Sequence, residues 1–181
     1  MKELVRWLRK KRIGTSVRLR EFIVTLLRPI GILPISASLS LRVFRGSGVV
    51  EDLGVVSTHE VTDDFVAALV DTLQASVAAF SNFKYHDSGT GVGAEDPTDS
   101  ALGTPCGEAR DTGTQVEGAT ANIYKSVATH TYAGTFAITE HGLFNAAAVG
   151  VLMDRSVFTA VNITLGDRIE FTYQLTCVSG G

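Results

Sequence analysis

Four kinds of residue in this chain could carry chemistry: a glycine-rich loop, four histidines, two cysteines and several clustered acids. The glycine-rich segment Gly89-Thr90-Gly91-Val92-Gly93 has the composition of a loop that cradles phosphate. It lacks the GK[ST] ending of a Walker A motif and the GxGxxG spacing of a dinucleotide loop, and no helical pattern follows it directly. We therefore expect flexible turns there, and no cofactor.

The histidines and acids lack the spacing of a metal site. The histidines are His59, His86, His130 and His141, none within four residues of another. His86-Asp87 could ligate a metal, and Glu95, Asp96 and Asp99 could join Asp87 around Ca²⁺, but no EF-hand or other ordered ligand spacing is present. The sequence predicts a solvated acidic loop and no metal.

Hydrolase arrangements also fail on spacing. There is no GxSxG motif. Glu140 and His141 occupy adjacent strand positions that face opposite ways, which argues against a direct acid–base pair. Asp154-Arg155 is expected to form a register-setting or intersubunit ion pair. An enzyme gathers several polar groups in one cavity, whereas this chain is expected to place them on turns and rims, so no catalytic residues are predicted.

Cys106 and Cys177 are the only cysteines, and they form no CxxC motif. We expect a loop thiol at Cys106 and a buried thiol at Cys177. The charged N-terminus lacks the apolar core of a secretory signal. Arg28, Pro29 and Pro34 interrupt the only apolar region, so no membrane-spanning helix is predicted.

Charge is distributed very unevenly along the chain. Residues 1–45 hold 11 of the 16 Lys and Arg residues against only Glu3 and Glu21, a net charge of +9. Residues 46–181 hold the other five basic residues and 17 acidic ones, a net charge of −12. A basic segment on an acidic body usually meets an acidic partner, which could be nucleic acid, a membrane, another protein or a neighbouring copy.

Residues 1–36 read as a basic amphipathic arm, with apolar residues on helical faces over 2–13 and 17–28. Three interpretations stay open: a helix packed on its own domain or on a neighbouring copy, docking on another protein, and contact with membrane or nucleic acid. The candidate partner-binding residues are Arg6, Trp7, Arg9, Lys10, Lys11, Arg12, Arg18, Arg20, Phe22 and Arg28.

Residues 37–181 have the pattern of an antiparallel β domain. Apolar residues alternate over 39–43 and 168–177, and a turn at 45–48 predicts an opening hairpin. Further strands are expected near residue 85, over 123–131, over 136–144 with a reversal at 145–150, and over 157–163. Leu165-Gly166-Asp167 predicts a hairpin between the last two strands.

The body has one strong helical segment, residues 63–77. Thr62, Asp63 and Asp64 offer an N-cap followed by acids in the first turn. Phe65, Leu69 and later apolar residues recur every four positions. The polar segment from residue 86 to 118 is expected to be a long loop, and loops of that length are usually functional or poorly ordered.

Four blocks carry a resemblance to a known family. They are FKYHDSGTG at 83–91, EGATANIYKSVATHTY at 117–132, ITEHGLFNAA at 138–147 and LMDRSVFTAVNITLGDRIEFTYQLT at 152–176. Together they resemble small virion proteins of tailed bacteriophages, several of which are capsid decoration, or cement, proteins. ITEHGLFN is also similar to the ITE-x-GLF-(D/N) strand of phage tail-collar and fibre domains. The resemblance covers 83–177 well and 41–82 more loosely, and it leaves out the arm.

The resemblance implies a β-sandwich without catalytic residues that binds other virion subunits. We expect an antiparallel, jelly-roll-like sandwich at 37–181 with one helix, and a cement function on the outer surface of a phage capsid, after assembly in the host cytoplasm. The expected partners are the major capsid protein and further copies of the chain, with a trimer favoured. Small-molecule substrate, nucleic acid and membrane are not expected. The alternatives are a tail-fibre or receptor-binding protein using the 87–118 loop, and a hydrolase of host glycans.

Overall fold

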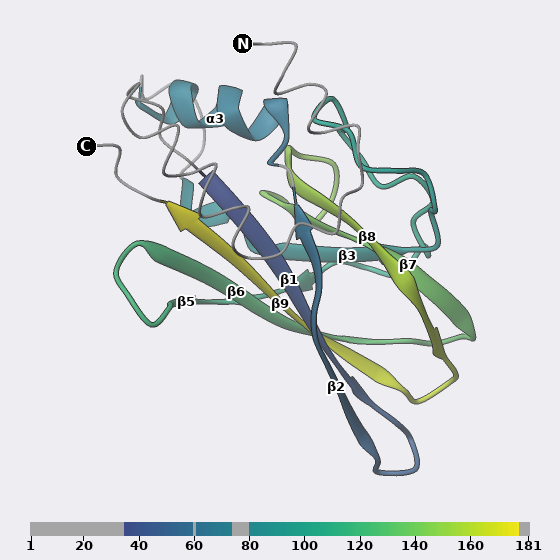
Figure 1. The fold of residues 1–181 in the computed structure, drawn as a ribbon. Helices are drawn as coiled ribbons and strands as arrows, with labels where there is room; N and C mark the ends of the chain where they lie inside the picture. Colours follow the sequence, from purple (N-terminus) through teal and green to yellow (C-terminus); the bar gives the residue numbers. More distant parts are fainter. Residues whose placement is uncertain (1–34, 60, 74–79, 178–181) are drawn as a thin grey trace. The chain divides into compact units, whose positions relative to one another are not determined.

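The structure is a computed structural model that describes residues 35–59, 61–73 and 80–177. This part of the chain forms two antiparallel β-sheets and one α-helix (Figure 1). The predicted mainly β fold with one helix is confirmed, and the jelly-roll likeness stays a prediction. Residues Ile35–Cys177 form one compact unit, so the first strand includes the last two residues that the sequence assigned to the arm.

The larger sheet has five strands in the order β2-β1-β9-β6-β5. Their bounds are β1 Ile35–Phe44, β2 Val50–His59, β5 Thr114–Glu117, β6 Ile123–Thr131 and β9 Arg168–Cys177. The central strands β1 and β9 show the predicted alternation, with Leu39, Leu41 and Val43 of β1 fully buried. β1 and β2 form the predicted opening hairpin, and β1 pairs with β9 along its whole length.

The smaller sheet has four strands in the order β4-β3-β7-β8. Their bounds are β3 Tyr85–Gly89, β4 Asp111–Thr112, β7 Phe136–Phe144 and β8 Leu152–Ile163. β7 and β8 form the hairpin predicted around residues 145–150. β7 is buried on both faces from Ile138 to Phe144, because the core lies against one face and residues of the 90–110 segment against the other.

The hairpin predicted between β8 and β9 is wrong, since the two strands belong to different sheets. The turn between them is held by Asp167, whose carboxylate accepts hydrogen bonds from the N–H groups of Thr164 (3.0 Å) and Gly46 (2.8 Å) and pairs with Arg45 at 3.1 Å. These bonds tie the turn to the β1–β2 loop, so β9 continues beside β1. Alternation predicted the buried face of β9 but not the strands with which it pairs.

The helix α3, Asp63–Leu73, starts as predicted. The Thr62 hydroxyl accepts a hydrogen bond from the N–H of Phe65 at 3.2 Å, which makes Thr62 the N-cap. Phe65 is buried and meets Phe83 edge to face, with ring centroids 5.2 Å apart. The predicted helix ran to residue 77, and residues 74–77 lie outside the described part. A short 3₁₀ turn, Phe80–Asn82, leads into β3.

The two sheets are joined at both sides of the sandwich. Val61, just after β2, forms a bridge with Asp154 of β8. On the opposite side the chain passes from β4 to β5 through Gly113 alone, and so changes sheet within one residue. A Cβ at Gly113 would lie 2.4 Å from the Ser126 hydroxyl and 2.7 Å from Nε2 of His86, so only glycine fits this crossing.

Candidate functional site

The ten arm residues predicted to bind a partner lie outside the described residues. They are Arg6, Trp7, Arg9, Lys10, Lys11, Arg12, Arg18, Arg20, Phe22 and Arg28. Their role stays a prediction. The described part of the chain instead presents three groups of polar residues and one pocket as candidates for a site.

The first group lies on the outer face of the smaller sheet and surrounds Glu140. This side chain is fully buried. Its carboxylate accepts hydrogen bonds from the N–H groups of Gly91 (2.9 Å), Gly103 (2.9 Å) and Thr104 (2.7 Å), and from Arg155 at 2.8 Å. Burial alone would raise the pKa of Glu140, but the donors, led by Thr104, outweigh it and the pKa lies below the usual value.

This arrangement explains the glycine-rich segment. A Cβ at Gly89 would lie 2.4 Å from the carbonyl oxygen of Thr104, and one at Gly91 would lie 2.5 Å from Oε1 of Glu140. The glycines therefore let the backbone approach a carboxylate closely, as such loops do with phosphate. The anion held by this loop belongs to the protein itself.

Arg155 completes the outer group and corrects two predictions. Its guanidinium is 5% exposed and bonds Glu140 at 2.8 Å and Asp99 at 3.0 Å. The predicted ion pair of Arg155 with Asp154 is wrong, because neighbouring positions on a strand face opposite sides of the sheet. The loop is also not simply solvated, since Asp99 binds Arg155 and the Glu95 carboxylate accepts the N–H of Val157 at 2.7 Å.

The second group crosses the interior between the sheets. Nδ1 of His86 lies 2.9 Å from Nε2 of His141, and Nε2 of His86 lies 2.8 Å from the Ser126 hydroxyl. All three side chains are buried, and burial lowers the pKa of His86 to about 3. His86 is therefore neutral at ordinary pH. The expectation that polar residues sit on turns and rims is wrong for His86, His141 and Ser126, which are buried and hydrogen-bonded to each other.

Asp154 also lies in the interior, fully buried. Its Oδ1 accepts a hydrogen bond from the Ser156 hydroxyl at 2.9 Å, while Oδ2 has no hydrogen-bond partner among the described groups. Burial raises the pKa of this carboxyl well above its usual value. The hydroxyl of Tyr173, from the opposite sheet, is likewise buried and without a hydrogen-bond partner in the described part. These groups face a packed core and not a solvent-filled cleft.

The third group surrounds Cys106. The hydroxyl of Ser88 lies 3.5 Å from the thiol and 3.0 Å from the hydroxyl of Tyr132. His130 interacts with the thiol on one side and hydrogen-bonds Asp111 through Nδ1 on the other. Both cysteines are partly buried and free, so the predicted loop thiol is correct in position but is not isolated.

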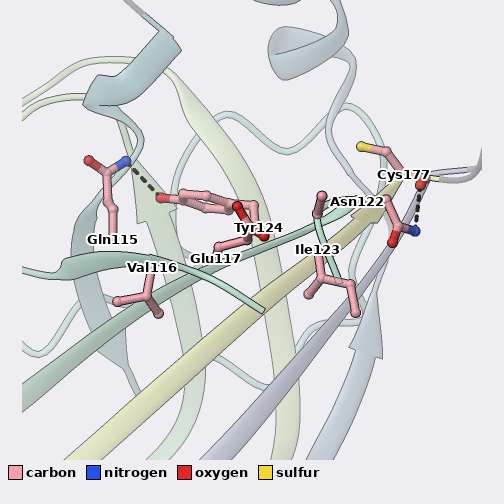
Figure 2. A pocket seen from close by; sticks show the side chains of 8 residues that line it. Gln115, Val116, Glu117, Asn122, Ile123, Tyr124 and Cys177 are labelled. Carbon is pink, nitrogen blue, oxygen red and sulfur yellow. Dashed lines mark hydrogen bonds between the residues drawn. The ribbon is translucent and has the colours of Figure 1, made fainter. Parts of the chain in front are cut away.

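One open pocket of about 430 Å³ lies over the β5–β6 hairpin (Figure 2). Its lining consists of Gln115, Val116, Glu117, Ala121, Asn122, Ile123, Tyr124 and Cys177. The amide of Gln115 donates to the hydroxyl of Tyr124 at 2.9 Å, and the amide of Asn122 donates to the carbonyl oxygen of Cys177 at 2.9 Å. These polar groups bond each other, and the pocket brings together no acid–base pair.

Within the described ranges, no group of three His, Cys, Asp or Glu side chains is arranged to hold a metal ion. In the same ranges, no helix has the length and apolar character needed to cross a membrane. Sequence reasoning missed the Cys106–His130–Asp111 group because its members come from the end of a loop, from β6 and from β4. No local spacing signals such a group, since the strand pairing brings it together.

No protein-family model, curated protein or solved structure matches this chain. The resemblance to phage virion proteins therefore rests on the four sequence blocks alone, and the function drawn from it is a proposal.

Proposed function

We propose that this protein is a capsid decoration, or cement, protein, which binds the outer surface of a phage capsid and stabilises contacts between major capsid protein subunits. One observation carries the proposal. The basic arm leads directly into β1, a strand with hydrogen-bonded neighbours on both sides, β2 and β9. Force applied to the arm is therefore carried by an interior strand of the five-stranded sheet.

The charges of the body support the proposal. Four of its arginines form ion pairs within the body, Arg42 with Glu170, Arg45 with Glu51 and Asp167, Arg110 with Asp87, and Arg155 with Glu140 and Asp99. Two of the five basic residues of 46–181, Arg110 and Arg155, are thus paired within the body, and acidic residues remain in excess over this range. Such a body and a basic arm favour neighbours of complementary charge, including further copies of the chain.

The rigidity of the body also supports an adhesive role. The long loop is fixed by the buried Glu140 carboxylate and by Leu102, which packs with Phe144 and Leu152 on the outer face of the smaller sheet. A surface that is already ordered loses little conformational entropy on binding. The described loop therefore suits repeated attachment to a regular lattice. We expect a symmetric oligomer, with a trimer favoured.

Binding to purified phage heads that lack this protein tests the proposal. We expect the full chain to sediment with heads, and residues 35–181 to fold but bind at least about tenfold more weakly, because the arm supplies steering charge and contact area. The truncation begins at Ile35 so that β1 stays complete. Undiminished binding of the truncated chain would show that the arm does not contribute to head binding.

A matched pair of variants separates arm charge from total charge. Lys10→Gln with Lys11→Gln removes two positive charges from the arm, and Lys84→Gln with Lys125→Gln removes two from the body. We expect only the first pair to weaken head binding and to reduce its salt dependence. If the full chain binds isolated tails and not heads, the cement function is wrong and a tail-fibre function takes its place.

A further inference from the structure

Cys106 is held in a fixed position at the edge of the smaller sheet. Its backbone N–H donates to the carbonyl oxygen of Ser88 at 3.0 Å, and the preceding Pro105 bridges to Gly89. The Ser88 hydroxyl lies 3.5 Å from the thiol. The sheet thus fixes the position of Cys106, and the residue is partly exposed.

His130 provides a second, independent sign of reactivity. Its side chain is 4% exposed, and Nε2 has no well-formed hydrogen bond to a described group. Nδ1 is bonded to the carboxylate of Asp111, which is itself 38% exposed, and the ring meets Tyr132 edge to face with centroids 4.5 Å apart. A carboxylate on one ring nitrogen fixes the ring and favours its protonated form.

The two side chains favour opposite charges on each other. Burial opposes the charged form of both groups. The pKa of Cys106 is nevertheless lowered, by His130 first and then by the Ser88 hydroxyl and the N–H of Glu108. The pKa of His130 is raised, because Cys106 and Asp111 together outweigh its burial. This is the pattern of a thiolate–imidazolium pair oriented by a carboxylate.

We propose that Cys106, paired with His130 and Asp111, is a reactive thiolate that undergoes thiol–disulfide exchange with disulfides of small thiols. In the exchange the Cys106 sulfur attacks one sulfur of the disulfide, a new S–S bond forms as the old one breaks, and the other half leaves as a thiolate that takes up a proton from solvent. Cys106 is oxidised and the departing half of the disulfide is reduced. This site goes beyond the adhesive function and does not depend on it.

A disulfide of small thiols is the simplest partner for a cysteine that is only partly exposed. The pocket of Figure 2 is lined by residues of the β5–β6 hairpin and by Cys177, and Cys106 is not among them. The other thiol has the opposite character, since burial raises the pKa of Cys177. Of the two cysteines, Cys106 is therefore the reactive one and Cys177 is not.

The rate of reaction with 4,4′-dithiodipyridine tests the proposal, followed by the absorbance of the released thiopyridone. The reduced full chain carrying Cys177→Ser presents Cys106 alone, and Cys106→Ser presents Cys177 alone. At about pH 6.5 we expect Cys106 to react at least about tenfold faster than Cys177, because more of it is thiolate. Equal rates for the two cysteines would overturn the proposal.

Variants of the neighbours identify the cause. Both variants are made in the Cys177→Ser chain. At about pH 6.5, His130→Gln should slow the reaction about tenfold, and Asp111→Asn should slow it by a smaller factor. The rates should converge near pH 10, where the thiol of each variant is ionised. Glu117→Gln is the matched control, because it removes an exposed carboxylate that is not among the groups acting on the sulfur, and its rate should not change. Asp111 is partly exposed, so its variant stays informative if His130→Gln fails to fold. Identical pH–rate profiles for Asp111→Asn and the parent would refute the assigned role.

Discussion

Replacing Glu140 by glutamine changes one atom of the side chain and removes the charge on which the outer loop is built. Oε1 of Glu140 receives two N–H groups, from Gly91 and Thr104. Oε2 receives one from Gly103 and one from Nε of Arg155, and Nη2 of Arg155 lies 2.8 Å from it in the ion pair. All five partners are donors. Whichever way the glutamine amide turns, its NH₂ group faces at least two donors, and Arg155 loses a buried anion.

The expected loss of stability is large. Removing one member of a buried ion pair costs about 3 to 5 kcal/mol, because the remaining charge stays buried without compensation. Here the neighbouring Asp99, with a side chain 24% exposed, still binds Arg155, so we expect the lower part of that range, about 3 kcal/mol. A domain of this size is stable by about 5 to 15 kcal/mol, so the variant should still fold.

Urea denaturation at neutral pH measures this loss. With a slope of about 2 kcal/mol per molar urea, a loss of about 3 kcal/mol lowers the midpoint by about 1.5 M. Hydrogen exchange gives a local check, since the amides of Gly91, Gly103 and Thr104 should lose protection before the strands do.

Glu170→Gln is the matched control, because the same chemical change there affects a more exposed pair. The side chains of Glu170 and Arg42 are 24% and 47% exposed, and Oε1 of Glu170 lies 3.2 Å from Nη1 of Arg42. The control should therefore cost less than about 1 kcal/mol. If Glu140→Gln costs no more than Glu170→Gln, and the three loop amides stay protected, the Glu140 carboxylate does not hold the loop in place.

Three further outcomes follow from the interior. The pKa of His86 is about 3 in the folded state, against 6.5 when unfolded, so between these values only the unfolded chain binds the proton and folding stability falls as pH falls. Urea titrations should show about 2 kcal/mol less stability near pH 5 than near pH 7.5. His86→Gln should remove that part of the pH dependence. Gly113→Ala should lower the melting temperature measured by calorimetry by several degrees, whereas Gly93→Ala, whose added Cβ meets nothing within 4 Å, should leave it unchanged. Phe65→Ala should cost about 3 to 5 kcal/mol in the same urea assay, because the ring is 1% exposed.

Local patterns predicted the local structure well. Alternation identified the buried face of β9, and turn residues identified the hairpins β1–β2 and β7–β8. The cap at Thr62 was also predicted, because a hydroxyl followed by two acids acts within one helical turn. These features depend on residues within about ten positions of each other, and the sequence displays them directly.

The assignment of strands to sheets and the buried polar contacts could not be predicted. Glu140 and Gly91 are 49 residues apart, and His86 and Ser126 are 40 apart. Nothing in either local segment indicates the other, and a polar side chain in a strand is normally taken as exposed. The polar residues of the 86–118 segment suggested a solvated loop for the same reason, although several of them bind buried partners.

The pairing of Ile35 with Cys177 brings the two ends of the body to adjacent positions on neighbouring strands. A linker of a few residues could therefore join them, and new ends could be opened elsewhere, for example in the exposed loop between β7 and β8. Such a circular permutant would keep every strand in place while the basic arm is attached at another point, or at none. The point of attachment of the tether and the integrity of the sandwich thus become separate experimental variables.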